Sequence, residues 1–223
     1  MIRKFDQLNW HVRIFEGVDV SSNERAPTPD QIQQALAHNR WDPHAWSVMQ
    51  GHMTMLETYV QESTAPYVMC MEDDILIRSD INDHLPKIVL DFELCKLDLL
   101  MLGYLIHEPM CVMSHEHAVL NQVFTFHEYP FNIYGTQMYM MTRSHAEWLV
   151  QSYGYHTQWQ TQVLSTSDSY NADWVITKQG KRACVYPLLA IEQSGGGQAY
   201  ADQDQTHFHQ LCHAANYPLT TYL

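Results

Sequence analysis

The sequence is poor in basic residues and has no long apolar run, and each shortage excludes a class of protein. Only 12 residues are Lys or Arg, against 25 Asp and Glu, which gives a formal net charge of -13 at pH 7. Nucleic acids and anionic membranes attract basic surfaces, so we expect neither as a main partner. No stretch of about eighteen apolar residues occurs, and Met1 to Asp6 do not resemble a secretory signal. We therefore expect no transmembrane segment and a soluble, cytoplasmic protein.

Closely spaced cysteine pairs are also missing. The chain has five cysteines, none of them in a CxxC pair, at positions 70, 95, 111, 184 and 212. An odd and scattered set of this kind is typical of reduced thiols in a reducing compartment. The sequence therefore predicts no disulfide framework, and it shows no internal repeat.

The overall composition is that of a folded globular domain. Of the 223 residues, 46% are hydrophobic and 17% are charged, so the chain is long and apolar enough to bury a sizeable core. Gly195-Gly196-Gly197 then begins a segment of low apolar content. We expect one domain over residues 1–194 and a C-terminal tail over 195–223 that packs on it.

Three consecutive carboxylates follow an apolar run that extends from Tyr67 to Met71. These residues, Glu72, Asp73 and Asp74, are called the acidic triplet below. The run has the length and composition of a strand buried on both faces of a parallel sheet, and ligands bind beyond the carboxyl ends of such strands. Adjacent carboxylates repel one another, and hard divalent cations relieve that repulsion while binding a diphosphate. The triplet is therefore a candidate metal and diphosphate site; the alternative is an acidic turn that caps the next helix.

Helical and extended patterns alternate along the chain, which predicts an α/β fold. Helices are expected over residues 29–38, 42–62, 80–92, 144–153 and 171–176. Strands are expected over residues 10–15, 67–71, 97–103, 134–141 and 182–190, the last of them interrupted by Pro187. We predict a mostly parallel, mixed sheet with helices on both faces. Residues 107–133 show no clear period and are expected to form a long insertion or short edge strands.

Two histidine-rich stretches raise the question of a zinc site. The insertion contains four histidines, at 107, 115, 117 and 127, whose spacing fits no usual zinc pattern. In the tail, His209, Cys212 and His213 would share one face of a helix and are a second, independent zinc candidate.

Seven blocks of sequence, in a fixed order, resemble those of one enzyme family. They are Arg13 to Asp19, Gly51-His52, Val68 to Ile75, Leu97 to Gly103, Gly135 to Ala146, Ala172-Asp173, and Tyr186-Pro187 through Gln193. Each block alone is weak, but their order and spacing over roughly residues 10–194 resemble glycosyltransferase family 25, the lipopolysaccharide and collagen galactosyltransferase-like enzymes.

The resemblance implies a GT-A-like, Rossmann-like fold and a metal-dependent, inverting transfer of a sugar. The donor would be a nucleotide sugar, foremost a UDP-sugar, the acceptor a glycan or glycoconjugate, and the cofactor Mn²⁺ or Mg²⁺. Within the acidic triplet, Asp74 would bind the metal, while Glu72 and Asp73 would contact the ribose or sugar hydroxyls of the donor. This assignment is chemically reasonable, because a divalent cation stabilises the charge that develops on a departing nucleoside diphosphate.

Further roles follow from the same resemblance. Asp173 matches a late aspartate of the family and would be the base that deprotonates the acceptor, with Asp168 as a neighbouring alternative. The other interpretation of Asp173 is a carboxylate that interacts with a helix N-terminus. His207 or His209 would complete the metal shell, and Arg13 is a candidate donor contact by its location.

One departure from the family leaves a second function open. The family begins with a donor-binding strand, whereas Ile2 to Leu8 resembles the helix that should follow that strand. A noncatalytic carbohydrate- or metal-binding module on a degenerate GT-A fold is therefore the alternative hypothesis. A metal-dependent phosphohydrolase is a third.

Overall fold

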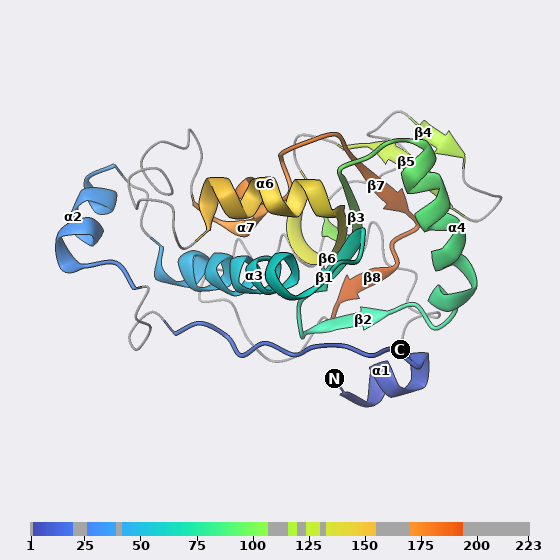
Figure 1. Cartoon of the computed structure of the whole chain (residues 1–223), viewed down its shortest axis with the longest axis horizontal. Coiled ribbons are helices and arrows are strands. Elements are labelled where there is room, and N and C mark those ends of the chain that lie inside the picture. The colour runs from blue at the N-terminus through green and yellow to red at the C-terminus, as the bar shows by residue number, and fades with distance from the viewer. Residues whose placement is uncertain are drawn as a thin grey trace. The chain divides into compact units, whose positions relative to one another are not determined.

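The computed structural model shows an α/β protein whose described residues are 2–19, 26–38, 42–106, 116–119, 124–129, 133–154 and 170–193 (Figure 1). Its helices are α1 (Ile2–Leu8), α2 (Pro29–Ala37), α3 (Pro43–Glu62), α4 (Ile81–Leu94), α6 (Arg143–Tyr153) and α7 (Ala172–Val175). Its strands are β1 (Tyr67–Met71), β2 (Ile75–Ile77), β3 (Leu99–Leu105), β4 (Glu116–Val119), β5 (Thr125–Glu128), β6 (Tyr134–Thr142), β7 (Arg182–Tyr186) and β8 (Ala190–Glu192).

The chain divides into two compact units, each built from separate stretches of sequence. The first unit contains Met1–Val12, Met71–Met140 and Lys181–Leu223, and the second contains Arg13–Cys70 and Met141–Gly180. The acidic triplet belongs to the first unit.

The strands form a mixed sheet and a smaller one. A six-stranded sheet has the order β1-β6-β3-β7-β5-β4, and β2 pairs with β8 in a two-stranded sheet. The pairing of β3 with β7 is parallel, whereas β5 with β7, β4 with β5, and β2 with β8 are antiparallel. The predicted mixed sheet is confirmed, but the prediction that it is mostly parallel is wrong for these pairings: the insertion adds β4 and β5 as antiparallel strands, and β8 runs antiparallel to β2. The coverage of both faces by helices stays a prediction.

The core of the first unit centres on β3. Every residue of this strand is buried, as its continuous apolar sequence predicts. The hydroxyl group of Tyr104 donates a hydrogen bond to the carbonyl oxygen of Val185, which ties β3 to β7. At Gly103 an added Cβ would lie 2.8 Å from the carbonyl oxygen of Ala190, so only glycine allows β8 to pass this close.

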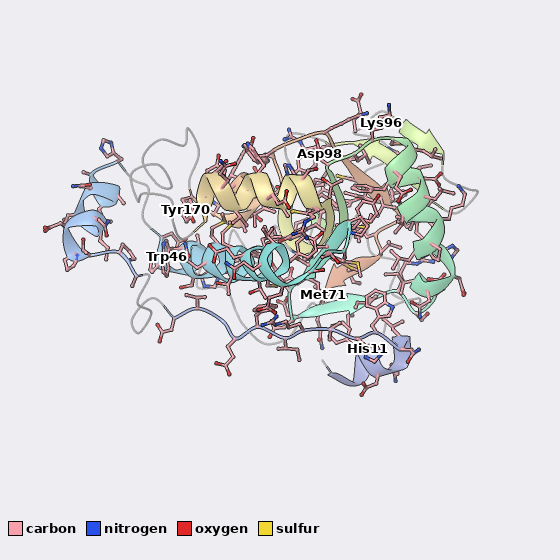
Figure 2. The ribbon with its side chains drawn as sticks, viewed as in Figure 1. His11, Trp46, Met71, Lys96, Asp98 and Tyr170 are labelled. Carbon is pink, nitrogen blue, oxygen red and sulfur yellow. The ribbon has the colours of Figure 1, made fainter. Side chains whose placement is uncertain are left out.

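The second unit is organised around α3, which packs against α6 and α7. Asp42 caps the start of α3, because its carboxylate accepts hydrogen bonds from the backbone amides of His44 and Ala45. Inside the unit, the Gln50 amide donates to the hydroxyl of Tyr170 over 3.1 Å. Figure 2 shows Tyr170 beside the first turns of α3, near Trp46. This contact connects α3 to the segment that leads into α7.

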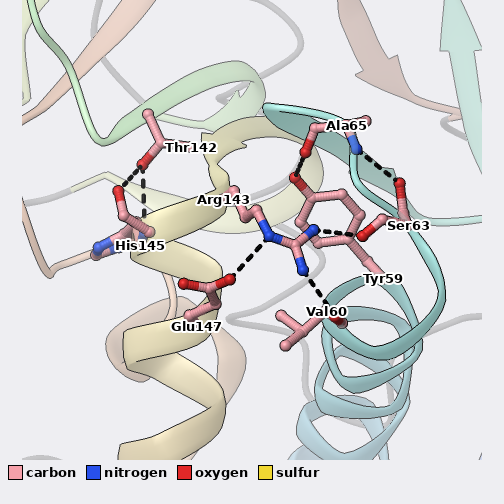
Figure 3. Close-up of polar contacts among 9 residues, drawn as sticks. Tyr59, Val60, Ser63, Ala65, Thr142, Arg143, His145 and Glu147 are labelled. Atoms are coloured by element: carbon pink, nitrogen blue, oxygen red, sulfur yellow. Dashed lines mark hydrogen bonds and ion pairs between the residues drawn. The ribbon is translucent and has the colours of Figure 1, made fainter.

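Arg143, the first residue of α6, links that helix to the end of α3 (Figure 3). Its guanidinium group donates to the carbonyl oxygens of Ser63 and Val60 over 2.5 and 2.8 Å. It also pairs with Glu147 at 2.8 Å and lies over the ring of Tyr59. The last carbonyl groups of a helix have no partner inside the helix, so Arg143 satisfies groups that would otherwise depend on water.

Most elements lie where the sequence predicts them, with two corrections. The predicted strand at residues 10–15 is wrong: the segment has no regular structure, and Val12 and Ile14, which alternation would bury, are 37% and 54% exposed. The run Tyr67–Met71 is a strand, but only Cys70 is buried, so the expectation of burial on both faces is also wrong. The reason is that β1 is an edge strand of the sheet.

Other sequence-based expectations concern single features of the chain. The cysteines at 70, 95 and 184 are free thiols in the described part of the protein. Residues 195–223, the predicted tail, lie outside the described residues, so the predicted domain boundary stays a prediction. None of the described helices has both the length and the apolar character that crossing a bilayer requires.

Candidate functional site

The acidic triplet forms the turn between β1 and β2, and main-chain hydrogen bonds hold both of its ends. The backbone amide of Glu72 donates to the carbonyl oxygen of Gln137 in β6 over 3.0 Å. The carbonyl oxygen of Asp74 accepts from the amide of Gln193, just after β8, over 2.7 Å. The backbone of the triplet is therefore held at Glu72 by a hydrogen bond to β6, and at Asp74 by a hydrogen bond to the residue after β8.

The side chain of Glu72 is also held. The hydroxyl group of Thr136 in β6 donates a hydrogen bond of 2.6 Å to Oε1 of Glu72. Thr136 itself is buried, with 2% of its surface exposed. Hydrogen bonds from a hydroxyl to a carboxylate are short and stronger than those between neutral groups. Glu72 is consequently the most firmly positioned carboxylate of the triplet.

Asp74 lies in a strongly acidic environment. Its pKa is raised from 3.8 to about 6, first because neighbouring protein atoms displace water from the carboxyl group, and then because Glu72 and Glu192 repel its ionised form. Glu192 comes close because β8 pairs with β2 so that Ile75 lies opposite Glu192. Over the whole residue both Asp73 and Asp74 are exposed, so the Asp74 carboxyl group loses only part of its surrounding water. A bound cation would favour the ionised form of Asp74.

The chemistry of these groups fits a hard divalent cation. Carboxylate oxygens are the preferred ligands of Mg²⁺ and Mn²⁺, and such ions need only one or two carboxylates when substrate phosphates supply further oxygens. Within the described ranges, no group of three or more His, Cys, Asp or Glu side chains has a spacing that could hold a metal by itself. The triplet therefore fits a metal that is bound together with a phosphate-containing ligand better than a metal bound by protein alone.

Asp173, the candidate base, lies in the first turn of α7, in the second unit. The side chain of Asn171 caps this short helix by accepting from the amide of Trp174 over 3.0 Å. The hydroxyl of Thr177 donates to the carbonyl oxygen of Asp173, which continues the turn beyond α7. Asp173 is partly exposed on a well-fixed backbone, as either a base or a helix-terminal carboxylate would be. Asp168 lies outside the described residues.

Arg13, the candidate donor contact, has a partner in its own unit. Its guanidinium group pairs with the carboxylate of Glu62, at the end of α3, at 2.5 Å, and lies over the ring of Phe15. Both charged side chains of this pair are about 60% exposed, so water competes for each of them. The pairing is weak enough for Arg13 to exchange partners, and its contact with a donor stays a prediction.

The predicted histidine sites fall almost entirely outside the described residues. This holds for His207 and His209, for the second zinc candidate in the tail, and for His107 and His115 of the insertion, whereas the third histidine of the insertion, His117, belongs to strand β4. The fourth, His127, is buried in β5, where its ring lies 2.7 Å from the hydroxyl of Thr125 and edge-on to Tyr186. The described surroundings of His127 are those of a core histidine.

Two residues that contact or influence the triplet were not predicted as parts of the site. Thr136 lies 64 positions from Glu72 in the sequence, and Glu192 approaches Asp74 only through the register of β8 against β2. Both residues fall inside blocks that resemble the glycosyltransferase family, but no local pattern of residue types distinguishes them. Only the pairing of β6 and β8 with the strands beside the triplet brings these two residues close to it, and the sequence alone does not show that pairing.

Comparison with known proteins adds no assignment. No protein-family model matches the chain, and no curated protein matches it significantly.

Proposed function

We propose that this protein is a metal-dependent glycosyltransferase that moves a sugar from a nucleotide-sugar donor, foremost a UDP-sugar, to a glycan or glycoconjugate acceptor. The observation that carries the proposal is the group of carboxylates of Glu72, Asp74 and Glu192, where the pKa of Asp74 is raised to about 6. Such a concentration of negative charge at the end of a strand is suited to a divalent cation and a diphosphate. The ordered sequence blocks that resemble glycosyltransferase family 25 support the same proposal.

In the proposed reaction, the residues of the triplet bind and orient the donor. Glu72, held by Thr136, accepts hydrogen bonds from ribose or sugar hydroxyl groups, and Asp73 does so from the exposed side of the turn. Asp74 provides an oxygen ligand for Mn²⁺ or Mg²⁺. When bound, the cation supplies charge stabilisation for the departing nucleoside diphosphate.

The acceptor needs a base. As the acceptor oxygen forms a bond to the anomeric carbon, the bond from that carbon to the diphosphate breaks, and the diphosphate keeps the electron pair. The acceptor hydroxyl loses its proton in the same step. Asp173 is the proposed proton acceptor, with Asp168 as the alternative, and inversion at the anomeric carbon is proposed on the sequence resemblance alone.

One observation favours a second candidate function. Residues 10–15, predicted to form a strand that overlaps the first block of the resemblance, form an irregular segment instead. A noncatalytic carbohydrate- or metal-binding module would need no such strand. It would bind glycans or a metal without consuming a nucleotide sugar.

The two candidate functions differ in whether the protein consumes a nucleotide sugar. The protein is incubated with a panel of UDP-sugars and glycan acceptors in the presence of Mn²⁺, and both released UDP and glycosylated product are measured. We expect release of UDP and transfer for one donor, and a loss of at least about a hundredfold in Asp74→Asn, since the charge that binds the metal is removed. Glycan binding without any UDP release would favour the module.

A matched substitution controls for a general effect of charge. Asp83 is an exposed aspartate in the first turn of α4, in the same unit but outside the acidic triplet. Asp83→Asn removes the same charge, and we expect it to retain wild-type activity. Full activity of Asp74→Asn would contradict the assigned role of the triplet.

A further inference from the structure

We infer that Thr136 is a positioning residue that fixes the Glu72 carboxylate for donor binding. The inference rests on the proposed function, because it assigns a task to Thr136 through the task proposed for Glu72. Neither the sequence patterns nor the resemblance assigns Thr136 a role.

A short hydrogen bond makes Thr136 a side chain that directs the Glu72 carboxylate. The 2.6 Å hydrogen bond joins a hydroxyl on a fully buried strand residue to Oε1 of a carboxylate at the edge of the turn. The carbonyl oxygen of Gln137, the next residue of β6, accepts a hydrogen bond from the backbone amide of Glu72. Two consecutive residues of one strand therefore fix both the main chain and the side chain of Glu72.

The backbone before Thr136 makes this arrangement specific. Gly135 has a φ of +87°, a backbone conformation that residues other than glycine rarely adopt. The buried amide of Gln137 occupies the space that a Cβ at Gly135 would need. Thr136 therefore lies between a glycine that the backbone conformation requires and a buried glutamine side chain that fills the space beside that glycine.

The consequence concerns donor binding more than the chemical step. A glutamate side chain rotates about several bonds, and ordering it at the moment of binding costs conformational entropy. Thr136 orders it beforehand, and its hydroxyl takes only one of the roughly four lone-pair positions of a carboxylate. Loss of the hydroxyl should therefore weaken binding of the donor, and so raise KM, while kcat changes little.

The test compares variants that keep or remove the hydroxyl. Binding of the UDP-sugar that the wild type accepts is measured by calorimetry in the presence of Mn²⁺. Thr136→Val should weaken binding about tenfold, as loss of one hydrogen bond to a charged group would. Thr136→Ser should stay within about twofold of the wild type, because it keeps the donor group. If the valine variant does not fold, Thr136→Ala takes its place in the same comparison.

Two controls separate a role through Glu72 from a general effect on the strands. Thr125→Val removes a hydroxyl that interacts with His127 and Tyr186 in the same unit, and it should leave donor binding unchanged. In a Glu72→Ala background, Thr136→Val should cause no further loss, since the carboxylate that Thr136 holds is then already absent.

The outcomes distinguish the inference from the proposed function. Wild-type affinity in Thr136→Val, or additive losses in the double variant, would overturn the inference while leaving the proposed function in place. If the wild type binds no nucleotide sugar with or without Mn²⁺, the proposed function fails, and the inference fails with it.

Discussion

At the scale of single residues, the acidic triplet combines one firmly held carboxylate with one that is electrostatically unfavourable. Glu72 is fixed by Thr136, whereas Asp74 has a pKa raised to about 6 by loss of water and by repulsion from Glu72 and Glu192. Such an arrangement is costly in the absence of a ligand, and strained or perturbed groups of this kind gather at functional sites. The cost can be measured directly.

The raised pKa of Asp74 predicts how stability depends on pH. The folded state binds the Asp74 proton more tightly than the unfolded state does, so this carboxyl group favours folding below pH 3.8 and loses that effect as pH rises through about 6. Asp74→Asn removes the ionisation. In metal-free buffer, its melting temperature should therefore rise relative to the wild type between pH 4.5 and pH 7.5.

The salt dependence of the same measurement provides its control. High salt screens the repulsion from Glu72 and Glu192 but not the loss of water, so it should shrink the difference between the two proteins at pH 7.5 without abolishing it. A difference in melting temperature that does not change with pH would contradict the environment assigned to Asp74.

Alanine substitutions at two glycines, Gly135 and Gly51, should change the stability of the protein in opposite directions. Gly135→Ala should lower the free energy of unfolding by about 1–3 kcal/mol for the backbone conformation alone, and further because the new Cβ displaces the Gln137 amide. Gly51 lies inside α3, where an added Cβ meets nothing within 4 Å. Gly51→Ala should therefore stabilise the protein, by roughly 0.5–1 kcal/mol. Urea denaturation of both variants measures the contrast, and destabilisation by Gly51→Ala would refute it.

At the scale of elements, local signals were sufficient for helices and insufficient for one strand. Asp42-Pro43 marks the start of α3, and in the structure Asp42 caps this helix, because capping depends on residues that are neighbours in sequence. Alternation at residues 10–15 failed, since a strand also needs a partner, and partners come from elsewhere in the chain. The burial of β1 failed for the same reason: its edge position depends on the order of the strands.

Arg143 joins two elements, and its replacement tests how much that junction contributes. Arg143→Lys keeps the charge but loses the planar guanidinium group, whose nitrogens contact Val60, Ser63 and Glu147 at the same time. We expect a loss of about 1–3 kcal/mol in the free energy of unfolding, the usual cost of a partly buried, charge-assisted network. Arg13→Lys is the matched control, because its exposed pair with Glu62 should contribute about 0–1 kcal/mol. Equal effects of the two substitutions would contradict the capping role of Arg143.

At the scale of the whole molecule, the sequence located the centre of the candidate site but not its surroundings. The acidic triplet is contiguous in sequence, so its charge pattern alone made it a candidate. Thr136 and Glu192 reach it through β6 and β8, and no local pattern encodes strand order or register. The number of antiparallel pairings escaped prediction likewise, in part because β4 and β5 arise from an insertion without periodicity.

The central claim is that the acidic triplet binds a nucleotide sugar together with a divalent cation. The most direct test is thermal unfolding of the wild type and of Asp74→Asn with a panel of nucleotide sugars, each with Mn²⁺ and with EDTA. A donor at about a hundred times its Kd adds about 2.7 kcal/mol, and each kcal/mol raises the melting temperature of a domain of this size by roughly 2–4 °C. We predict a rise of several degrees that needs one nucleotide sugar, Mn²⁺ and Asp74 together. An equal rise in Asp74→Asn, or no rise with any nucleotide sugar, would contradict the claim.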